Sequence, residues 1–201
     1  MSKLLKFKLK GTRLYVHGTD IYNAVFNYLI NINSDMTQLE ISFHGVTSTH
    51  LELTQELPID RKRIKCIAHY LDAKGIKNSW YVLETLEPVS QSYQYDESLI
   101  TEASIINHDN ESVTISTIKH YTFIENVVAL NKHLLLHLFA DEQGKWLFTK
   151  LQLNKPYLES AEIHHQELKL ELKANFNFRL TKTELFLGGQ SAGYIYFSLL
   201  K

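Results

Sequence analysis

Cysteine is almost absent from this sequence, and its shortage excludes two kinds of architecture. Cys66 is the single cysteine among 201 residues, so the chain forms no internal disulfide and no cysteine-rich zinc cluster. Chains with so little cysteine are typical of a reducing compartment, and we expect the cytoplasm. The first residues, Met-Ser-Lys-Leu-Leu-Lys, also lack the apolar core of a secretory signal peptide.

An excess of charge of either sign is also missing. The chain has 21 Lys and Arg against 22 Asp and Glu, a formal net charge of -1, and no basic run longer than residues 61–63. This balance provides no long-range attraction for nucleic acid, so no nucleic-acid partner is expected. The longest apolar run, residues 134–140, is interrupted by His137 and is too short to span a bilayer, so no membrane span is expected.

What the sequence does have is the composition of a globular protein and an internal repeat. Hydrophobic residues make up 44% and charged residues 21%, which is ordinary for a chain that forms a core. Residues 17–25 and 120–128 carry His, Thr, Ile, Asn and Val at the same offsets. Such a repeat indicates two copies of one unit.

Each copy of the repeat leads into an apolar stretch with helical spacing, so two helices are predicted. The second, running to about residue 140, is apolar around most of its circumference and must be covered on most sides. Thr122 stands three residues before Glu125, which is the spacing of a capping box, and Thr19 is the expected cap of the first helix. Each predicted cap follows the histidine of its repeat by two residues.

Alternating apolar and polar residues predict antiparallel strands around each helix. They cover residues 4–16, 39–43, 51–53, 64–71 and 80–86 in the first half, and 104–106, 113–115, 146–153, 168–174, 183–187 and 194–200 in the second. In the first of them, the solvent face is expected to hold Lys6, Lys8 and Lys10. Residues 89–102, rich in Ser, Gln, Tyr and Asp, are interpreted as a linker between an N-terminal half, 1–88, and a C-terminal half, 103–201.

This order of elements is α+β, with a curved sheet around one apolar helix in each half. It resembles the hotdog fold, here as a tandem double hotdog with two antiparallel sheets, each wrapped around a central apolar helix. The resemblance covers nearly the whole chain and rests on the element order and the repeat. Hotdog proteins are mostly acyl-thioester enzymes, either thioesterases or 3-hydroxyacyl dehydratases. The resemblance therefore implies a dehydratase or thioesterase that binds acyl-CoA or an acyl carrier protein, needs no cofactor, and is compatible with a homo-oligomer.

The resemblance also implies which residues form the site, because hotdog sites lie near the start of the central helix. His17 and His120 would transfer protons. Asp20 and Glu125 would supply acidic groups. Contacts to substrate would come from three amides, Asn23, Asn126 and Asn131. Amides left free at a helix N-terminus can stabilise a thioester carbonyl oxygen as it becomes negative.

Two local motifs match the family patterns only loosely. Residues 20–25 are similar to a thioesterase segment that ends in Asn-Ala, but the usual Gly-His pair is reversed to His17-Gly18 and precedes the acidic residue. The His-Phe-Pro-like stretch of dehydratases corresponds to residues 120–122, which contain no proline. Of the two halves, the one with His120 and Glu125 is the favoured location of a working site.

Every candidate residue also has an ordinary structural interpretation. Glu125 can be a capping-box partner, and Asp20 is favoured in a first helical turn by electrostatics alone. The two repeat histidines can bond backbone at a strand end, and the two repeat asparagines can tether helix to strand. Asn131 is a buried amide that needs partners. The alternative to an enzyme is therefore a non-catalytic hotdog that holds an acyl chain or serves as a subunit of a biosynthetic assembly.

No metal site is expected from the sequence. The remaining histidines, including His44, His69 and the pair His164-His165, are interpreted as having no His-x-x-x-His or carboxylate arrangement typical of a metal site.

Overall fold

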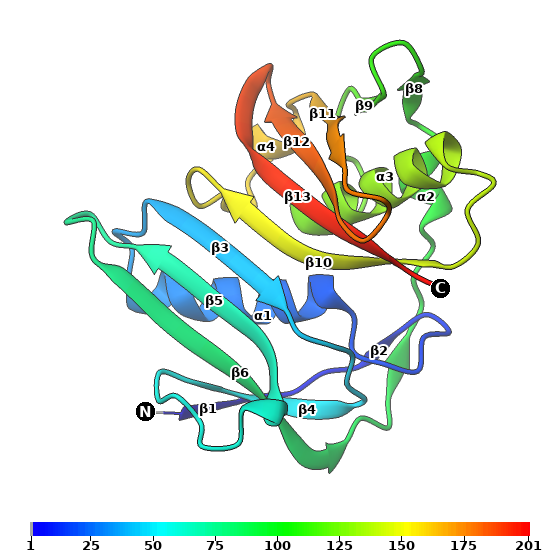
Figure 1. Cartoon of the computed structure of the whole chain (residues 1–201). Helices are drawn as coiled ribbons and strands as arrows, with labels where there is room; N and C mark the ends of the chain where they lie inside the picture. The colour runs from blue at the N-terminus through cyan, green and yellow to red at the C-terminus, as the bar shows by residue number, and fades with distance from the viewer. Residues whose placement is uncertain (1) are drawn as a thin grey trace. The chain divides into compact units, whose positions relative to one another are not determined.

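The computed structural model of the protein describes residues 2–201. The chain divides into two compact units, Met1–Asp96 and Glu97–Lys201, so the boundary falls inside the segment interpreted as a linker. Each unit contains one long helix and an antiparallel sheet (Figure 1).

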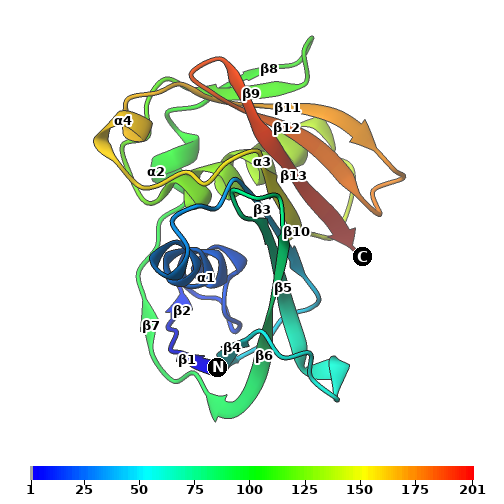
Figure 2. The ribbon, with the colours of Figure 1, turned by 90° about the vertical axis from the view of Figure 1, so that its left-hand side faces the viewer.

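The first unit is built around helix α1 (Gly18–Ile32). Its other elements are β1 (Ser2–Leu5), β2 (Leu9–Lys10), β3 (Gln38–Phe43), β4 (Thr49–Thr54), a short 3-10 helix η1 (Arg61–Arg63), β5 (Ile64–Leu71), β6 (Lys77–Pro88) and β7 (Ser92–Tyr93). Five strands form the order β1-β4-β6-β5-β3 with antiparallel neighbours, while β2 pairs in parallel with β7. Figure 2 looks almost along α1, which lies beside strands β5 and β6.

The core of the first unit lies between α1 and the inner face of this sheet. Strand β5 alternates strictly, so that Cys66, Ala68 and Tyr70 are buried. The ring of Tyr28 on α1 meets that of Trp80 on β6 edge to face, with 5.3 Å between centroids. Strands β5 and β6, both predicted from the sequence, pair in antiparallel fashion as a hairpin.

Two expectations for the start of the chain are wrong. Residues 4–16 form no continuous strand, but only the short strands β1 and β2 and the loops beside them. Lys10, expected on the solvent face, is wholly buried at 0% exposure. Its ammonium pairs with the Asp20 carboxylate at 3.1 Å and donates to the Thr19 hydroxyl at 2.7 Å. These partners make burial possible, because a buried cation must be paired.

The second unit is built around helix α3 (Phe123–Leu138). Its other elements are α2 (Ser98–Thr101), β8 (Ile105–Asn107), β9 (Ser112–Ile115), β10 (Lys145–Leu153), α4 (Ala161–His164), β11 (Leu168–Asn175), β12 (Thr181–Leu187) and β13 (Gln190–Leu200). The strands form the antiparallel order β10-β13-β12-β11-β9-β8. Helix α4 is a short element that the sequence pattern did not predict.

Helix α3 is the covered, apolar helix that its sequence predicts. Ile124, Val127, Leu130 and Leu134 are completely buried, and the helix packs against strands β9, β10 and β11. The predicted strands at 183–187 and 194–200 are parts of β12 and β13, which pair as a hairpin. Gly188 and Gly189 join its strands with φ of 57° and 77°, which suits glycine at both positions of a tight two-residue turn.

Candidate functional site

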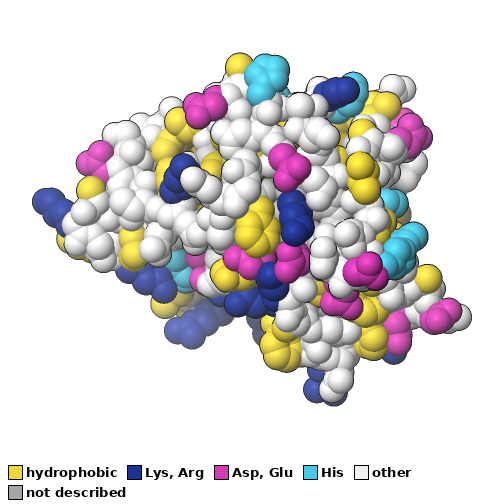
Figure 3. All heavy atoms as spheres, turned by 90° about the horizontal axis from the view of Figure 1, so that it is seen from above, with side chains coloured by type: hydrophobic (Ala, Val, Ile, Leu, Met, Phe, Trp, Pro, Cys, Tyr) yellow, Lys and Arg dark blue, Asp and Glu magenta, His cyan; other side chains and the backbone are white. Residues whose placement is uncertain are grey.

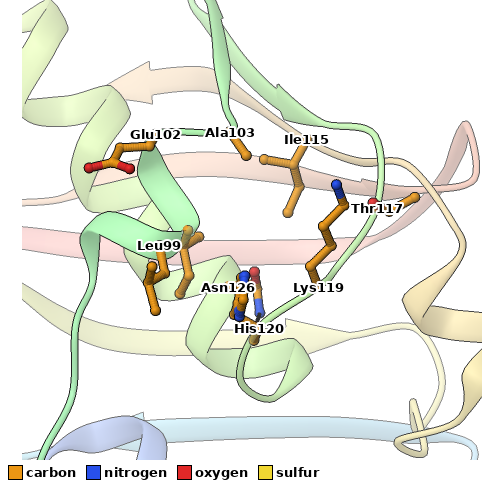
Figure 4. A pocket seen from close by; sticks show the side chains of 9 residues that line it. Leu99, Glu102, Ala103, Ile115, Thr117, Lys119, His120 and Asn126 are labelled. Atoms are coloured by element: carbon orange, nitrogen blue, oxygen red, sulfur yellow. Dashed lines mark hydrogen bonds between the residues drawn. The ribbon is translucent and has the colours of Figure 1, made fainter.

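A cavity of about 330 Å³ lies at the beginning of α3 in the second unit. It is bounded by α2, the end of β9, and the loop that leads from β9 into α3 (Figure 4). One part of its lining is apolar and consists of Leu99, Ile100, Ala103 and Ile115. The polar part consists of Glu102, Thr117, Lys119, His120 and Asn126. Two of the predicted site residues, His120 and Asn126, are therefore brought together here.

The backbone that presents His120 is held by the first turn of α3. Tyr121 has φ of 62°, a left-handed conformation that non-glycine residues rarely adopt. The Asn126 amide nitrogen donates to the carbonyl oxygens of His120 at 2.7 Å and Thr122 at 2.9 Å. These two bonds use both hydrogens of the Asn126 amide group, and they fasten the strained turn to the helix. This is the tethering role that the sequence left open for Asn126.

Glu125 does not line the cavity and is engaged in capping α3. One oxygen of its carboxylate accepts from both the backbone N–H and the hydroxyl of Thr122, each at 2.8 Å. The predicted capping box is therefore confirmed. The backbone N–H of Phe123 donates to Glu159 at 2.7 Å. Two backbone N–H groups at the start of α3 therefore already donate hydrogen bonds to carboxylates of the chain itself.

Asn131 lies two turns further along α3, away from this cavity. Its side chain is 0% exposed, and neither of its amide atoms has a hydrogen-bond partner in the described part of the chain. A buried amide without partners costs about 1–3 kcal/mol. Asn131 is therefore a polar group inside the core of the second unit, and it does not share a pocket with His120.

In the first unit, Asp20 and Asn23 line a more open cavity of about 280 Å³. The other lining residues are Lys6, Phe7, Lys8, Ala24 and Tyr93. One oxygen of the Asp20 carboxylate accepts from the Tyr93 hydroxyl at 2.8 Å and pairs with buried Lys10. That Lys10 ammonium also lies 4.5 Å from the centre of the Tyr95 ring. Asp20 is thus one member of a compact polar network at the start of α1.

His17 belongs to the same network and is itself the N-cap of α1, so the expectation that Thr19 caps this helix is wrong. The His17 Nδ1 atom lies 2.8 Å from the Thr19 hydroxyl oxygen, which already accepts from Lys10. The backbone N–H of Thr19 also donates to His17 Nδ1, at 3.4 Å, so this nitrogen is an acceptor and receives the hydrogen of the Thr19 hydroxyl. His17 therefore carries its own proton on Nε2.

The repeated residues consequently have different places in the two units. Helix α1 begins directly after its repeat histidine, whereas α3 begins three residues after His120. His17 is bonded into a helix cap, whereas His120 lines a cavity. The sequence pattern also missed Lys119, Tyr93 and Glu159, which contact the same regions. Nothing in their spacing marks them, since each reaches its site through the fold.

Two negative findings apply to the described residues 2–201. No group of three or more His, Cys, Asp or Glu side chains there is arranged to hold a metal ion. None of the helices in that range is long and apolar enough to cross a membrane.

Comparison with known proteins identifies the fold. No protein-family model and no curated protein matches the sequence. Among solved structures, the tesB protein of Mycobacterium avium subsp. paratuberculosis is 9% identical, with 99% of this chain and 96% of that chain covered and a TM-score of 0.51. A protein of Novosphingobium aromaticivorans named as a candidate thioesterase is 11% identical, with 100% and 95% covered and a TM-score of 0.51. The chain is a double hotdog.

These similarities cover nearly the whole chain and confirm the predicted fold class, the α+β double hotdog. The dehydratase domain of PpsC from Mycobacterium tuberculosis, in complex with C12:1-CoA, is also similar. It is 9% identical, with 99% of this chain and 94% of that chain covered and a TM-score of 0.48. At 9% and 11% identity, the similarity to the Mycobacterium avium and Novosphingobium structures establishes the fold alone. A shared fold does not fix the chemistry, which depends on the residues of this chain.

Proposed function

We propose that the double hotdog acts on acyl thioesters as a thioesterase, with the cavity at the start of α3 as its site. The observation that carries this proposal is the composition of that cavity. Its apolar wall suits an acyl chain, and its polar wall places an imidazole and an ammonium group beside that chain. The name of the Novosphingobium protein, a candidate thioesterase with the same fold, supports the same substrate class.

In the proposed reaction, His120 is the general base. Imidazole can accept a proton near neutral pH, so His120 would take one from water as the water oxygen attacks the thioester carbonyl carbon. The carbonyl electrons move to its oxygen, where the ammonium of Lys119 would stabilise the negative charge. Collapse of this intermediate breaks the carbon–sulfur bond, and His120 returns its proton to the departing thiolate. Asn126 acts through the backbone of His120, which makes it a positioning residue.

The test is hydrolysis of a panel of acyl-CoA esters, followed by colorimetric detection of the released thiol. Wild-type protein should hydrolyse at least one ester, and His120→Ala should reduce kcat by about 10²- to 10⁴-fold. His165→Ala is the matched control, because His165 is exposed in the same unit and does not line the cavity. Unchanged hydrolysis in His120→Ala would remove His120 from the mechanism. Dehydratase activity releases no thiol, so it is tested separately with 3-hydroxyacyl-CoA and 2-enoyl-CoA, by following the ultraviolet absorbance of the conjugated enoyl thioester.

A second candidate is a non-catalytic double hotdog that binds an acyl chain. It is favoured by the carboxylates of Glu125 and Glu159, which occupy the amides of Thr122 and Phe123 where a substrate oxygen would be stabilised. Tight binding of acyl-CoA by calorimetry, with no turnover of any ester, would support this candidate over the enzyme.

The nature of the carrier and the compartment form part of the same proposal. Acyl-CoA and acyl carrier protein share the thioester and the phosphopantetheine arm, so either would present the same reacting group. A cytoplasmic location agrees with the single thiol of the chain. Comparing kcat/KM for one acyl group on the two carriers distinguishes them.

A further inference from the structure

Three histidines of the second unit lie apart from the cavity at the start of α3. His133 and His137 stand on α3, and His108 lies in the turn between β8 and β9. The two helical residues are four positions apart, so they project from one face of the helix. That spacing is typical of metal-binding histidine pairs, and it was overlooked in the sequence. His108 and His137 are exposed, and histidine side chains are visible at the protein surface in Figure 3.

In the folded chain, the side chains of His108 and His137 contact each other through their Nε2 atoms. Their Nε2 atoms are 2.8 Å apart, and the ring centroids are 4.6 Å apart with 47° between the planes. Two imidazole nitrogens at this separation have either the hydrogen of an N–H···N bond or a metal ion between them. A straight N–H···N bond would put the centroids roughly 5 Å apart. The shorter separation means that the two ring axes converge toward a common point.

We propose that His108 and His137 bind a divalent transition-metal ion through their Nε2 atoms, with solvent completing the coordination. Two protein ligands are consistent with the absence of any preformed three-ligand group in residues 2–201. The next imidazole along the helix, His133, lies 6.5 Å from His137 between ring centroids. The site is independent of the proposed acyl-thioester chemistry.

The charges around this pair tolerate a cation. The pKa of His133 is lowered, first by its burial and then by the charge of His137, while Glu97 acts in the opposite direction. Lys132 projects nearby, but its ammonium is paired with the Glu97 carboxylate at 3.1 Å.

The nitrogen separation also selects the class of metal. With each nitrogen about 2.0 Å from the ion, a right angle at the metal sets the nitrogens about 2.8 Å apart, whereas a tetrahedral angle sets them about 3.3 Å apart. The observed 2.8 Å matches the right angle. Nickel(II) and copper(II) prefer such square or tetragonal geometry with nitrogen and oxygen ligands, whereas structural zinc prefers a tetrahedron. Magnesium and calcium are poor candidates because they require oxygen ligands.

The test is titration of the full, tag-free chain with nickel(II) chloride by isothermal calorimetry at pH 7.5. Wild-type protein should bind one ion per chain, and both His108→Gln and His137→Gln should weaken binding by about tenfold or more, because each removes one arm of a chelate. His165→Gln, which changes another exposed histidine of the same unit, should bind as wild type. Circular dichroism of each variant checks that the fold is retained.

Two results would overturn the metal site. One is equal affinity in wild type, His108→Gln and His137→Gln, which would place any bound nickel elsewhere on the surface. The other is no heat of binding for wild type with nickel up to about 1 mM, a concentration that reaches even weak sites. A parallel titration with zinc chloride should give weaker binding than nickel, as the separation of the two nitrogens predicts.

Discussion

At the scale of single residues, the most unusual feature is the buried cation of Lys10. Its side chain is 0% exposed and depends on the carboxylate of Asp20, which is 16% exposed. Removing one partner of a buried pair leaves the other charge uncompensated, so Asp20→Asn should lower the free energy of unfolding by about 3 kcal/mol. Urea denaturation followed by circular dichroism measures this change.

The matched variant for that pair is Lys10→Met, which removes the cation and leaves an apolar chain of similar length. Its cost should be smaller than that of Asp20→Asn, because the Asp20 side chain is 16% exposed, unlike wholly buried Lys10, and its carboxylate keeps the hydroxyl of Tyr93 as a donor. Equal stability of Asp20→Asn and wild type would show that the pair contributes nothing.

The same residues show what the sequence could and could not predict. The capping box of Thr122 and Glu125 was predictable, because both partners lie within one helical turn and need nothing else. The burial of Lys10 was not, because it depends on Tyr93 and Tyr95, more than eighty positions away in sequence. Placing Lys10 on a wet face followed the alternation rule correctly, and the tertiary contacts overrode that rule.

At the scale of elements, the pairing of β5 with β6 carries a charge interaction that responds to pH. Glu84 on β6 accepts from the hydroxyl of Thr47 and pairs with Lys65 on β5 at 2.9 Å. Burial alone would raise the pKa of Glu84, but the hydrogen bonds from Thr47 and Lys65 and the charges of Lys65 and Arg63 lower it overall. The folded state therefore favours the ionised carboxylate more than the unfolded chain does.

This lowered pKa gives a definite sign to the pH dependence. The stabilisation is complete above the ordinary value of 4.5 and is lost as the pH falls through the lowered value. Glu84→Gln should therefore cost about 0.5 kcal/mol at pH 7, an amount typical of a partly exposed pair, and nothing near pH 2. Chemical denaturation of both proteins across this range measures the difference. A gap that stays constant down to pH 2 would contradict the assignment.

Helices and strands whose apolar residues recur with a clear period were predicted well from the sequence. Elements without such a period were not. The hairpin of β12 and β13 was clear because two alternating runs flank Gly188 and Gly189. The two helices were clear because their apolar residues recur every three or four positions. Helix α4 has a single turn and no period to detect. The repeat in the sequence aligned the histidines but not the helix starts, because His17 took over the capping role itself.

At the scale of the whole molecule, each unit has its own central helix and sheet. The reactivity of the single thiol, that of Cys66, measures how often the first unit opens. Cys66 lies on β5 in the first unit, is 0% exposed, and has a pKa that burial raises. A thiol reagent needs the ionised sulfur and access to it, so Cys66 should react only when the first unit opens. The same protection keeps the thiol silent in the colorimetric assay of thioester hydrolysis.

Weakening the core of the first unit should therefore expose the thiol. Leu29 is completely buried on α1, and Leu29→Ala should cost about 3 kcal/mol through lost contacts and the cavity left behind. Where labelling follows the open fraction, that cost raises the labelling rate of Cys66 by roughly 100-fold. Leu57→Ala, at a leucine in the same unit that is 52% exposed, should leave the rate nearly unchanged. Fast labelling of wild-type protein in native buffer would mean that β5 is not part of a closed core.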